Sequence, residues 1–276
     1  MKGTTKTLLA VPAALAAGWC LLLRSRRDHE AWPVLKRFRY AHRGYHDKPA
    51  VPENSMAAFR RAVERGWGAE LDVHLMADGN LAVIHDSSLR RTAGADVQIE
   101  NLTRDDLSRY RLEESEEHIP LLEEVLALFE GKTPLIIELK TAGNNVDALC
   151  RAVAQRLDGY TGDFCIESFD PRAVRWFRGN RPRVCRGQLA ENFLADKNAA
   201  LPGYQKFAMT NLLTNALTRP DFIAYRFEDR GNPSLRLCRA LWKPVEVSWT
   251  LRSKEQLEAA EEAGNLCIFE QFDPET

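Results

Sequence analysis

The sequence predicts an α/β fold, a somewhat irregular TIM-type (β/α)8 barrel preceded by one N-terminal hydrophobic helix. Short apolar runs alternate along the chain with amphipathic stretches of helical periodicity, which is typical of a parallel sheet covered on both faces. The chain of 276 residues also has room for one barrel of this type. The predicted strands are 38–42, 69–75, 81–85, 134–140, 163–168, 183–188, 222–226, 245–250 and 266–270.

Start and stop signals delimit several helices between these strands. Residues 55–65 follow Asn54, a favourable N-cap residue, and stop at Gly66. Asn54 is interpreted first as this helix cap, and alternatively as a residue that positions the preceding loop. Two further helices are predicted, at 121–130 before Gly131 and at 253–263 from Ser253 to Gly264.

One predicted strand is more than an eight-stranded barrel needs, and residues 81–85 are the candidate for the extra one. Asp78-Gly79 is a strong signal for a two-residue hairpin turn. The few residues between the two runs leave no room for a crossover helix. We therefore expect an antiparallel hairpin, and a turn at this dipeptide would place Asp72 opposite His85.

Residues 8–23 form an apolar run without a charged side chain. A helix of this length spans about 24 Å, less than the roughly 30 Å of a bilayer core, and flanking residues can close the gap. We expect a single retained membrane anchor, with a cleaved signal peptide as the first alternative and a soluble protein as the second. Basic residues flank the run, with Lys2 and Lys6 before it and Arg24, Arg26 and Arg27 after it.

The expected organisation is an anchor with a basic linker in residues 1–30 and a catalytic barrel in residues 31–276. The linker character extends over residues 24–37. Because the heavier basic cluster follows the apolar run, the positive-inside rule favours a membrane-anchored protein with a cytoplasmic catalytic domain.

Composition limits the classes of binding partner and indicates the redox state of the cysteines. The formal net charge is −1 and the basic residues are dispersed, which argues against binding of nucleic acid through a broad basic face. No protein partner is predicted. Five cysteines follow the anchor, and they are scattered, odd in number and without metal-binding spacing. Reduced, buried thiols are expected.

Carboxylates are predicted to face the barrel interior on two strands. Strand side chains alternate between faces, so Glu70 and Asp72 share one face and Glu138 shares its own inward face with Lys140. Inward carboxylates are unfavourable unless they are paired or bind metal. Three carboxylates suit one divalent cation, Mg²⁺ or Ca²⁺. The alternative is a buried salt-bridge network that includes Arg43 and Lys140.

Two histidines, His42 and His85, are predicted at strand ends on one rim. A pair of this kind can act as general acid and general base near neutral pH. Arg43 is expected to hold a phosphate oxygen through its planar fork, and Lys140 to add a point charge. Trp249, at another strand end, is the aromatic residue expected to touch the substrate.

The order of these motifs resembles that of the glycerophosphodiester phosphodiesterase family over roughly residues 38–272. A lone His-Arg-Gly would be weak evidence for the family, whereas the ordered set of motifs is specific to it. The matching segments are His42-Arg43-Gly44, Pro52-Glu53-Asn54-Ser55, Glu70-Leu71-Asp72-Val73, Asp78-Gly79, His85-Asp86, Leu89, Arg91-Thr92, Pro120-Leu121-Leu122-Glu123, Glu138-Leu139-Lys140, Ser168-Phe169-Asp170 and Trp249-Thr250.

The resemblance implies a TIM-type barrel that hydrolyses glycerophosphodiesters to sn-glycerol 3-phosphate and an alcohol. It leaves open which histidine is the acid, and whether water or the substrate's own hydroxyl attacks first. The roles that it implies are metal ligands at Glu70, Asp72 and Glu138, catalytic histidines at His42 and His85, and phosphate binding by Arg43 and Lys140.

Two late segments depart from the family pattern. Leu251-Arg252 follows Trp249-Thr250 where Val-Asn is usual, and Phe269-Glu270-Gln271-Phe272 replaces a closing Thr-Asp-x-Pro. These segments shape the rim, so the specificity for the alcohol stays open.

Three functional hypotheses are carried forward. The first is a membrane-anchored glycerophosphodiester phosphodiesterase. The second is a lysophospholipase D-like activity, which an anchor near lipid would suit. The third is a non-catalytic, membrane-tethered barrel that binds phosphodiesters; loss of a metal ligand or histidine would favour it, and none is lost.

Overall fold

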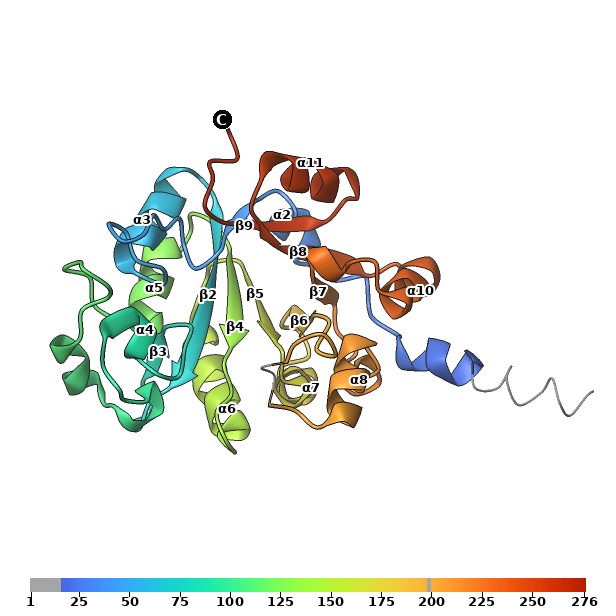
Figure 1. Ribbon diagram of the computed structural model, residues 1–276, viewed down its shortest axis with the longest axis horizontal. Helices are drawn as coiled ribbons and strands as arrows, with labels where there is room; N and C mark the ends of the chain where they lie inside the picture. Colours follow the sequence, from blue (N-terminus) through green and yellow to red (C-terminus); the bar gives the residue numbers. More distant parts are fainter. Residues whose placement is uncertain (1–15, 198–199) are drawn as a thin grey trace, which may run out of the picture.

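A computed structural model describes residues 16–197 and 200–276. Within these residues, eight parallel strands close into a barrel, because β1 pairs with both β2 and β9 (Figure 1). The predicted TIM-type barrel is confirmed, and its order is β1-β2-β4-β5-β6-β7-β8-β9. The strands are β1 (Tyr40–Ala41), β2 (Gly68–Leu75), β3 (Leu81–Val83), β4 (Leu135–Leu139), β5 (Phe164–Ser168), β6 (Arg186–Ala190), β7 (Phe222–Arg226), β8 (Val245–Leu251) and β9 (Leu266–Phe269).

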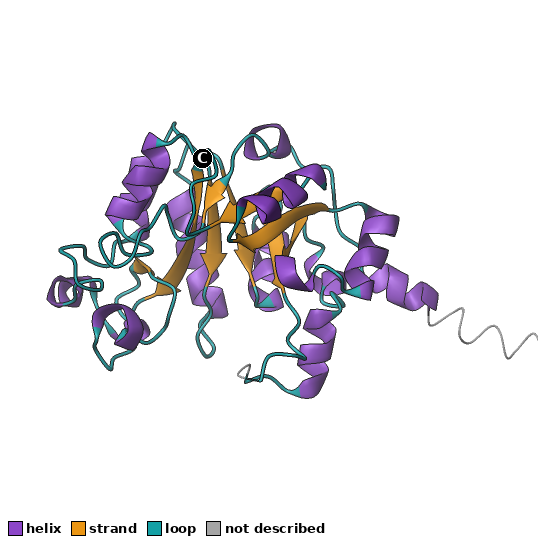
Figure 2. Ribbon diagram, turned by 45° about the horizontal axis from the view of Figure 1, so that its top comes forward, coloured by secondary structure: helices purple, strands orange, loops and turns teal. Residues whose placement is uncertain are grey.

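Helices surround this barrel on its outer face (Figure 2). Those predicted from caps and glycines are present as α3, α5 and α11, with ends within about two residues of the predicted ones. The helices are α2 (Trp32–Leu35), α3 (Met56–Glu64), α4 (Arg90–Ala93), α5 (Leu122–Phe129), α6 (Val146–Leu157), α7 (Pro171–Asn180), α8 (Gly203–Thr210), α9 (Asn215–Thr218), α10 (Pro233–Trp242) and α11 (Lys254–Glu262), with short 3₁₀ turns η1 (Ile99–Asn101), η2 (Arg104–Arg109) and η3 (Phe227–Asp229).

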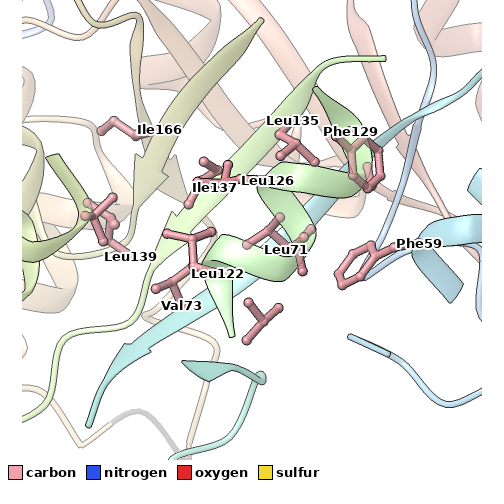
Figure 3. Close-up of a cluster of buried hydrophobic side chains, with 14 of the residues drawn as sticks. Phe59, Leu71, Val73, Leu122, Leu126, Phe129, Leu135, Ile137, Leu139 and Ile166 are labelled. Carbon is pink, nitrogen blue, oxygen red and sulfur yellow. The ribbon is translucent and has the colours of Figure 1, made fainter. Parts of the chain in front are cut away.

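The main core lies between the strands and the surrounding helices. Leu71 and Val73 of β2 point outward and are fully buried, as the alternation of strand side chains predicts. They pack with Leu122 and Phe129 of α5 (Figure 3). A second cluster fills the barrel itself. The inward faces of β2 and β4 are therefore free to carry polar groups at one end of the barrel.

β3 is the extra strand, and it forms the predicted antiparallel hairpin with β2. The predicted register was wrong by one residue, because Val73 pairs with Val83 and Asp72 therefore lies opposite Ile84 rather than His85. The turn is one residue longer than a two-residue hairpin, since the Met76 backbone N–H donates to the Asn80 carbonyl at 2.9 Å. His85 thus lies beyond the end of β3, and its side chain is placed by the bend that follows.

The end of the predicted anchor packs on the barrel. Residues 16–22 are helical, and Leu23 is fully buried beside β7 and α10. The Trp19 indole donates to the Ser234 hydroxyl at 3.2 Å, and the Asn215 amide donates to the Leu23 carbonyl at 3.2 Å. Residues 8–15 of the apolar run lie outside the described residues. Among the residues that are described, no helix is both long and apolar enough to cross a membrane.

The segment predicted as a basic linker, residues 24–37, contains the short helix α2. Its Trp32 and Leu35 side chains are buried in the cluster that fills the barrel. The five cysteines after the apolar run are free and buried, as expected, and Cys20 is half-buried.

Gly187 of β6 leaves space for the buried ring of Phe222 in the barrel. A Cβ at Gly187 would lie 2.0 Å from Phe222 Cε2. We expect Gly187→Ala to lower the free energy of unfolding by about 1–3 kcal/mol, because the fully buried ring has nowhere to move. Gly179→Ala in α7 is the matched control, since no atom lies within 4 Å of its Cβ, and it should be neutral or stabilising. Urea unfolding measures both, and equal stabilities would contradict this account.

Candidate active site

The site lies at the end of the barrel toward which the arrowheads of β2, β4 and β5 point (Figure 1). In TIM barrels this carboxyl-terminal face carries the catalytic groups. A cavity of about 140 Å³ opens there, and all the predicted site residues except Asp72 line it. The lining is His42, Arg43, Glu70, His85, Glu138, Lys140, Glu167, Phe169, Leu189, Trp249, Thr250, Arg252 and Ile268.

Glu70, Asp72 and Glu138 form one buried carboxylate cluster. Oxygen atoms of the three side chains lie within 4.8 Å of one another. The parallel register places Asp72 beside Glu138 on neighbouring strands. A buried Asp72 oxygen, Oδ1, accepts no hydrogen bond, although Lys140 Nζ lies 3.0 Å away. A compact set of carboxylate oxygens fits a hard divalent cation such as Mg²⁺ or Ca²⁺.

The charge balance of the barrel interior also favours a cation. Glu167 of β5 adds a fourth buried carboxylate, beside Glu138 in the strand register. Two cationic side chains, Arg43 and Lys140, face these four carboxylates in the cavity. The carboxyl groups outnumber these two cationic side chains, so a bound divalent cation would offset part of the remaining negative charge.

The three cluster carboxylates have different proton affinities. Burial, and then repulsion from Asp72 and Glu138, raises the pKa of Glu70 well above its ordinary range. Burial also raises the pKa of Glu138, against the opposing charge of Lys140. Burial alone would raise the pKa of Asp72, but the charges of Lys140, His85 and Arg43 hold it well below its ordinary range. Repulsion within the cluster is therefore only partly relieved by the neighbouring side chains.

His29, Cys185 and Asp221 form a second close grouping. Cys185 and Asp221 directly precede β6 and β7, so this grouping lies at the amino-terminal end of the barrel, opposite the carboxylate cluster. Asp221 there pairs with Arg26 at 3.2 Å and with Arg186 at 3.4 Å. The carboxylate is already compensated, so this grouping is a structural ion pair.

His42 is oriented by Glu270. The His42 Nδ1 atom lies 2.6 Å from Glu270 Oε2, and its Nε2 atom lies 3.8 Å from Glu70 Oε2. Burial lowers the pKa of His42 to about 4, against the hydrogen bond to Glu270. A neutral His42 that carries its proton on Nδ1 and donates it in a hydrogen bond to Glu270 presents the Nε2 lone pair to the carboxylate cluster.

Sequence reasoning missed this role of Glu270. The residue lies 228 positions after His42, in the segment that departs from the family pattern. The signal was present as the acidic residue that ends the last predicted strand, 266–270. The structure places it next to His42 because β1 and β9 are neighbours in the closed barrel. Arg252, in the other departing segment, pairs with the same carboxylate at 2.6 Å.

His85 is oriented by its sequence neighbour. The His85 Nδ1 atom lies 2.6 Å from Asp86 Oδ1, and the imidazole is 32% exposed. Arg91 joins this pair to the rim, because it donates to Asp86 at 2.6 Å and to Glu53 at 2.6 Å. His85 therefore has one ring nitrogen fixed and the other available toward the cavity that it lines.

The predicted phosphate-binding side chains reach the carboxylates. Lys140 Nζ lies 2.7 Å from Glu138 Oε1, and Arg43 donates to Glu53 Oε1 at 2.8 Å. Both line the cavity. Trp249 lines it as well, and its buried indole Nε1 donates no hydrogen bond to the residues that the structure describes.

Asn54 does not cap the helix, which corrects the first interpretation of this residue. Ser55 is the N-cap of α3, and its hydroxyl accepts from the Ala58 backbone N–H at 3.1 Å. The Asn54 amide instead donates to Asp72 Oδ2 at 2.8 Å. This hydrogen bond ties the loop before α3 to the carboxylate cluster, which fits the alternative interpretation that Asn54 positions this loop over the site.

Glu167→Gln is expected to stabilise the protein in the presence of a chelator. Burial and repulsion from Glu138 raise the pKa of Glu167 well above its ordinary range, and its Oε2 atom has no hydrogen-bond partner. The carboxyl of Glu167 keeps its proton in the folded protein and ionises in the unfolded chain. The free energy of unfolding therefore falls as pH rises above the ordinary pKa range of glutamate. The Tm of the variant should exceed that of the parent by several degrees at pH 8 and by much less at pH 5. Glu262→Gln, at an exposed position of α11, is the control. A gain in Tm that does not depend on pH would contradict the conclusion that the folded Glu167 is protonated.

Comparison with known proteins decides the family. The sequence model of the glycerophosphoryl diester phosphodiesterase family matches residues 42–270. The chain belongs to this family. A glycerophosphodiester phosphodiesterase of Bacillus altitudinis is 44% identical over 156 residues, 52% of this chain and 63% of that protein. A human lysophospholipase D is 36% identical over 121 residues, 39% of this chain and 37% of that protein. The matched regions thus span less than two thirds of either relative.

Solved structures share the fold of this family member. A phosphodiesterase of Oleispira antarctica, in complex with the product sn-glycerol 3-phosphate, superposes with a TM-score of 0.68 at 20% identity, covering 84% of this chain and 92% of that one. A glycerophosphodiester phosphodiesterase of Thermotoga maritima superposes with a TM-score of 0.64 at 24% identity, covering 84% and 94%. At these identities the likeness supports the barrel fold.

Proposed function

We propose that this protein hydrolyses glycerophosphodiesters to sn-glycerol 3-phosphate and an alcohol, with one divalent cation, Mg²⁺ or Ca²⁺. The observation that carries the proposal is the convergence, in one cavity, of a buried carboxylate cluster with two histidines that each have a carboxylate partner. The family membership and the activity named for the Bacillus altitudinis relative support it. The product complex of the Oleispira antarctica protein supports the same chemistry.

Glu70, Asp72 and Glu138 would hold the cation. Bound there, it would supply charge stabilisation for the phosphorane-like transition state. Arg43 and Lys140 line the same cavity, so a phosphate that enters meets both cationic side chains. Trp249 offers its unpaired indole N–H to a substrate oxygen.

The two histidines divide the proton transfers. We assign the general base to His42, because it is buried, neutral and directed by Glu270 with Nε2 toward the cluster. His85 then donates a proton to the leaving alkoxide, because it lies nearer to solvent and is held by Asp86. Water attacks phosphorus and the bond to the alcohol oxygen breaks.

Turnover of glycerophosphocholine by the full chain tests this function. The release of sn-glycerol 3-phosphate is measured with Mg²⁺, with Ca²⁺ and with EDTA. We expect release with at least one of the two cations and none with EDTA. Binding of the substrate without turnover under all conditions would instead favour the non-catalytic, phosphodiester-binding barrel.

A lysophospholipase D-like activity is the second candidate. The human relative that matches residues of this barrel carries that name. An apolar groove beside the cavity, described below, also favours a substrate with a hydrocarbon chain. Release of the headgroup alcohol from lysophosphatidylcholine, with little turnover of glycerophosphocholine, would favour this activity over the first.

We further propose that the protein is attached to the membrane by its N-terminal segment, with the catalytic domain on the cytoplasmic side. The uncharged run of residues 8–23 and the arginines after it support this arrangement. Sedimentation with the membrane fraction after an alkaline carbonate wash is expected, and recovery in the soluble fraction would contradict it. Protease digestion of intact and opened cells decides the side of the membrane.

A further inference from the structure

An apolar groove lies next to the catalytic cavity. It has a volume of about 550 Å³, and its wall includes Phe169, Phe193, Tyr204, Ala208 and Met209. The charged side chains in its wall, Asp170 and Arg172, pair with each other at 2.7 Å. Its size is that of a small-molecule site, and its wall carries no uncompensated charge. The groove therefore suits an uncharged, apolar ligand.

Phe169 connects the groove to the catalytic cavity. Its ring lines both spaces. It packs edge-on against Trp249, with ring centroids 5.5 Å apart, and edge-on against Phe193, with ring centroids 5.8 Å apart. Thr141, which follows Lys140 in the chain, also lines the groove. A substituent on a phosphodiester held near Lys140 would therefore lie beside the part of the groove wall formed by Thr141 and Phe169.

The outer end of the groove lies on an apolar surface. Tyr204 of α8 is 73% exposed and Phe207, one turn later, is 44% exposed. Trp19 of the N-terminal helix packs edge-on against Phe207, with centroids 5.8 Å apart, and the neighbouring Leu21 is 59% exposed. Figure 1 shows this helix beside α8 and α10. Exposed apolar side chains gathered in this way mark a site of interaction with apolar partners.

We propose that the groove binds the single acyl chain of a lysophospholipid whose phosphodiester occupies the catalytic cavity. This inference rests on the second candidate of the proposed function, the lysophospholipase D-like activity, and names the site that would hold the acyl chain of its substrate. The chain would enter past Tyr204, from the surface that the N-terminal helix shares with α8. Water adds its oxygen to phosphorus, the bond from phosphorus to the headgroup oxygen breaks, and the alkoxide takes up a proton. The products are a lysophosphatidate and the headgroup alcohol.

The first test varies the length of the chain. The full chain in lipid nanodiscs is given glycerophosphocholine and lysophosphatidylcholines with acyl chains of about four to ten carbons, at monomeric concentrations. Burial of each added methylene in the groove is worth up to roughly fourfold in kcat/KM. We expect a steep rise with chain length that levels off when the groove is full. A value of kcat/KM independent of chain length would overturn the proposal.

The second test fills the groove. Ala208→Phe places a ring in its wall, and Ala259→Phe on the exposed face of α11 is the matched control. Ala208→Phe should lower kcat/KM for the longest of these lysophosphatidylcholines by at least about tenfold. The value of kcat/KM for glycerophosphocholine should stay within about twofold of that of the parent protein. An equal fall in kcat/KM for both substrates would show that Ala208→Phe disturbs folding or the catalytic cavity. That result would overturn the proposal that the groove binds the acyl chain.

A binding measurement separates this proposal from the proposed function. Calorimetry compares glycerol 3-phosphate with octanoyl lysophosphatidate in the presence of Ca²⁺, and needs no turnover. Tighter binding of the acylated ligand, lost in Ala208→Phe, supports the groove even if neither substrate is hydrolysed. Equal affinities overturn it even if glycerophosphocholine is hydrolysed. A dimer of the parent that Ala208→Phe dissociates would assign the groove to a second copy of the chain instead.

Discussion

Replacement of His42 by alanine is expected to lower kcat for glycerophosphocholine by about 10²–10⁴-fold, and replacement of His85 by a similar factor. The two variants should separate on a substrate whose leaving group is p-nitrophenol. This leaving group departs without a proton, so His85→Ala should recover most of its lost rate, whereas His42→Ala should not. Rates with the two substrates, at saturating cation, give the comparison.

The same assignment makes Glu270 a positioning residue. Its carboxylate holds His42 Nδ1 at 2.6 Å, and Glu270→Gln would remove the charge that selects this tautomer. We expect a loss of about 10²-fold in kcat on both substrates, with KM little changed. Glu261→Gln, an exposed acidic residue in α11, serves as the control. If His42→Ala were rescued by the activated substrate and His85→Ala were not, the roles of the two histidines would be reversed.

Removal of the cation is expected to abolish turnover and to lower Tm. The carboxylates of Glu70, Asp72 and Glu138 lie within 4.8 Å of one another and are buried, so a divalent cation relieves repulsion that the folded chain otherwise retains. A cation at about a hundred times its Kd adds about 2.7 kcal/mol to the free energy of unfolding. Thermal melts with EDTA and with added Mg²⁺ or Ca²⁺ measure the effect.

The variant Glu138→Gln should lose the rise in Tm on addition of cation, and its turnover should fall by about 10³-fold or more. Glu123→Gln, a partly exposed acidic residue in α5 outside the cluster, is the control and should keep both. A protein that turns over at its full rate in EDTA would show that the cluster is a structural salt-bridge network. That network was the alternative interpretation of these residues.

The barrel and its polar interior were predictable because they rest on local patterns. Most of the strands follow from short apolar runs, although β6 begins three residues later than predicted. The alternation of side chains within β2 and β4 places Glu70, Asp72 and Glu138 on inward faces. His85 and Asp86 were readable as a pair because they are neighbours in the chain. Such features need only the geometry of one strand or one turn.

Contacts that depend on the length of a turn or on which residue caps a helix were less predictable. The hairpin of β2 and β3 was foreseen, but one additional residue in its turn moved Asp72 away from the expected position opposite His85. Asn54 was predicted as the N-cap because Asn and Ser are equally favourable at that position, but Ser55 is the N-cap of α3. A shift of one position along the chain reverses such assignments, and the residue types present do not distinguish one position from the next.

The barrel, the inward carboxylates and the two histidines at strand ends could be predicted without the structure, because period-two alternation and ordered motifs are properties of short segments. Only the tertiary structure brought Glu270 to His42, Glu167 to Glu138, and Trp19 to α8. These contacts join residues from distant parts of the chain. They exist because the barrel closes β9 onto β1, aligns β5 with β4 and leaves an apolar surface on α8 for the N-terminal helix.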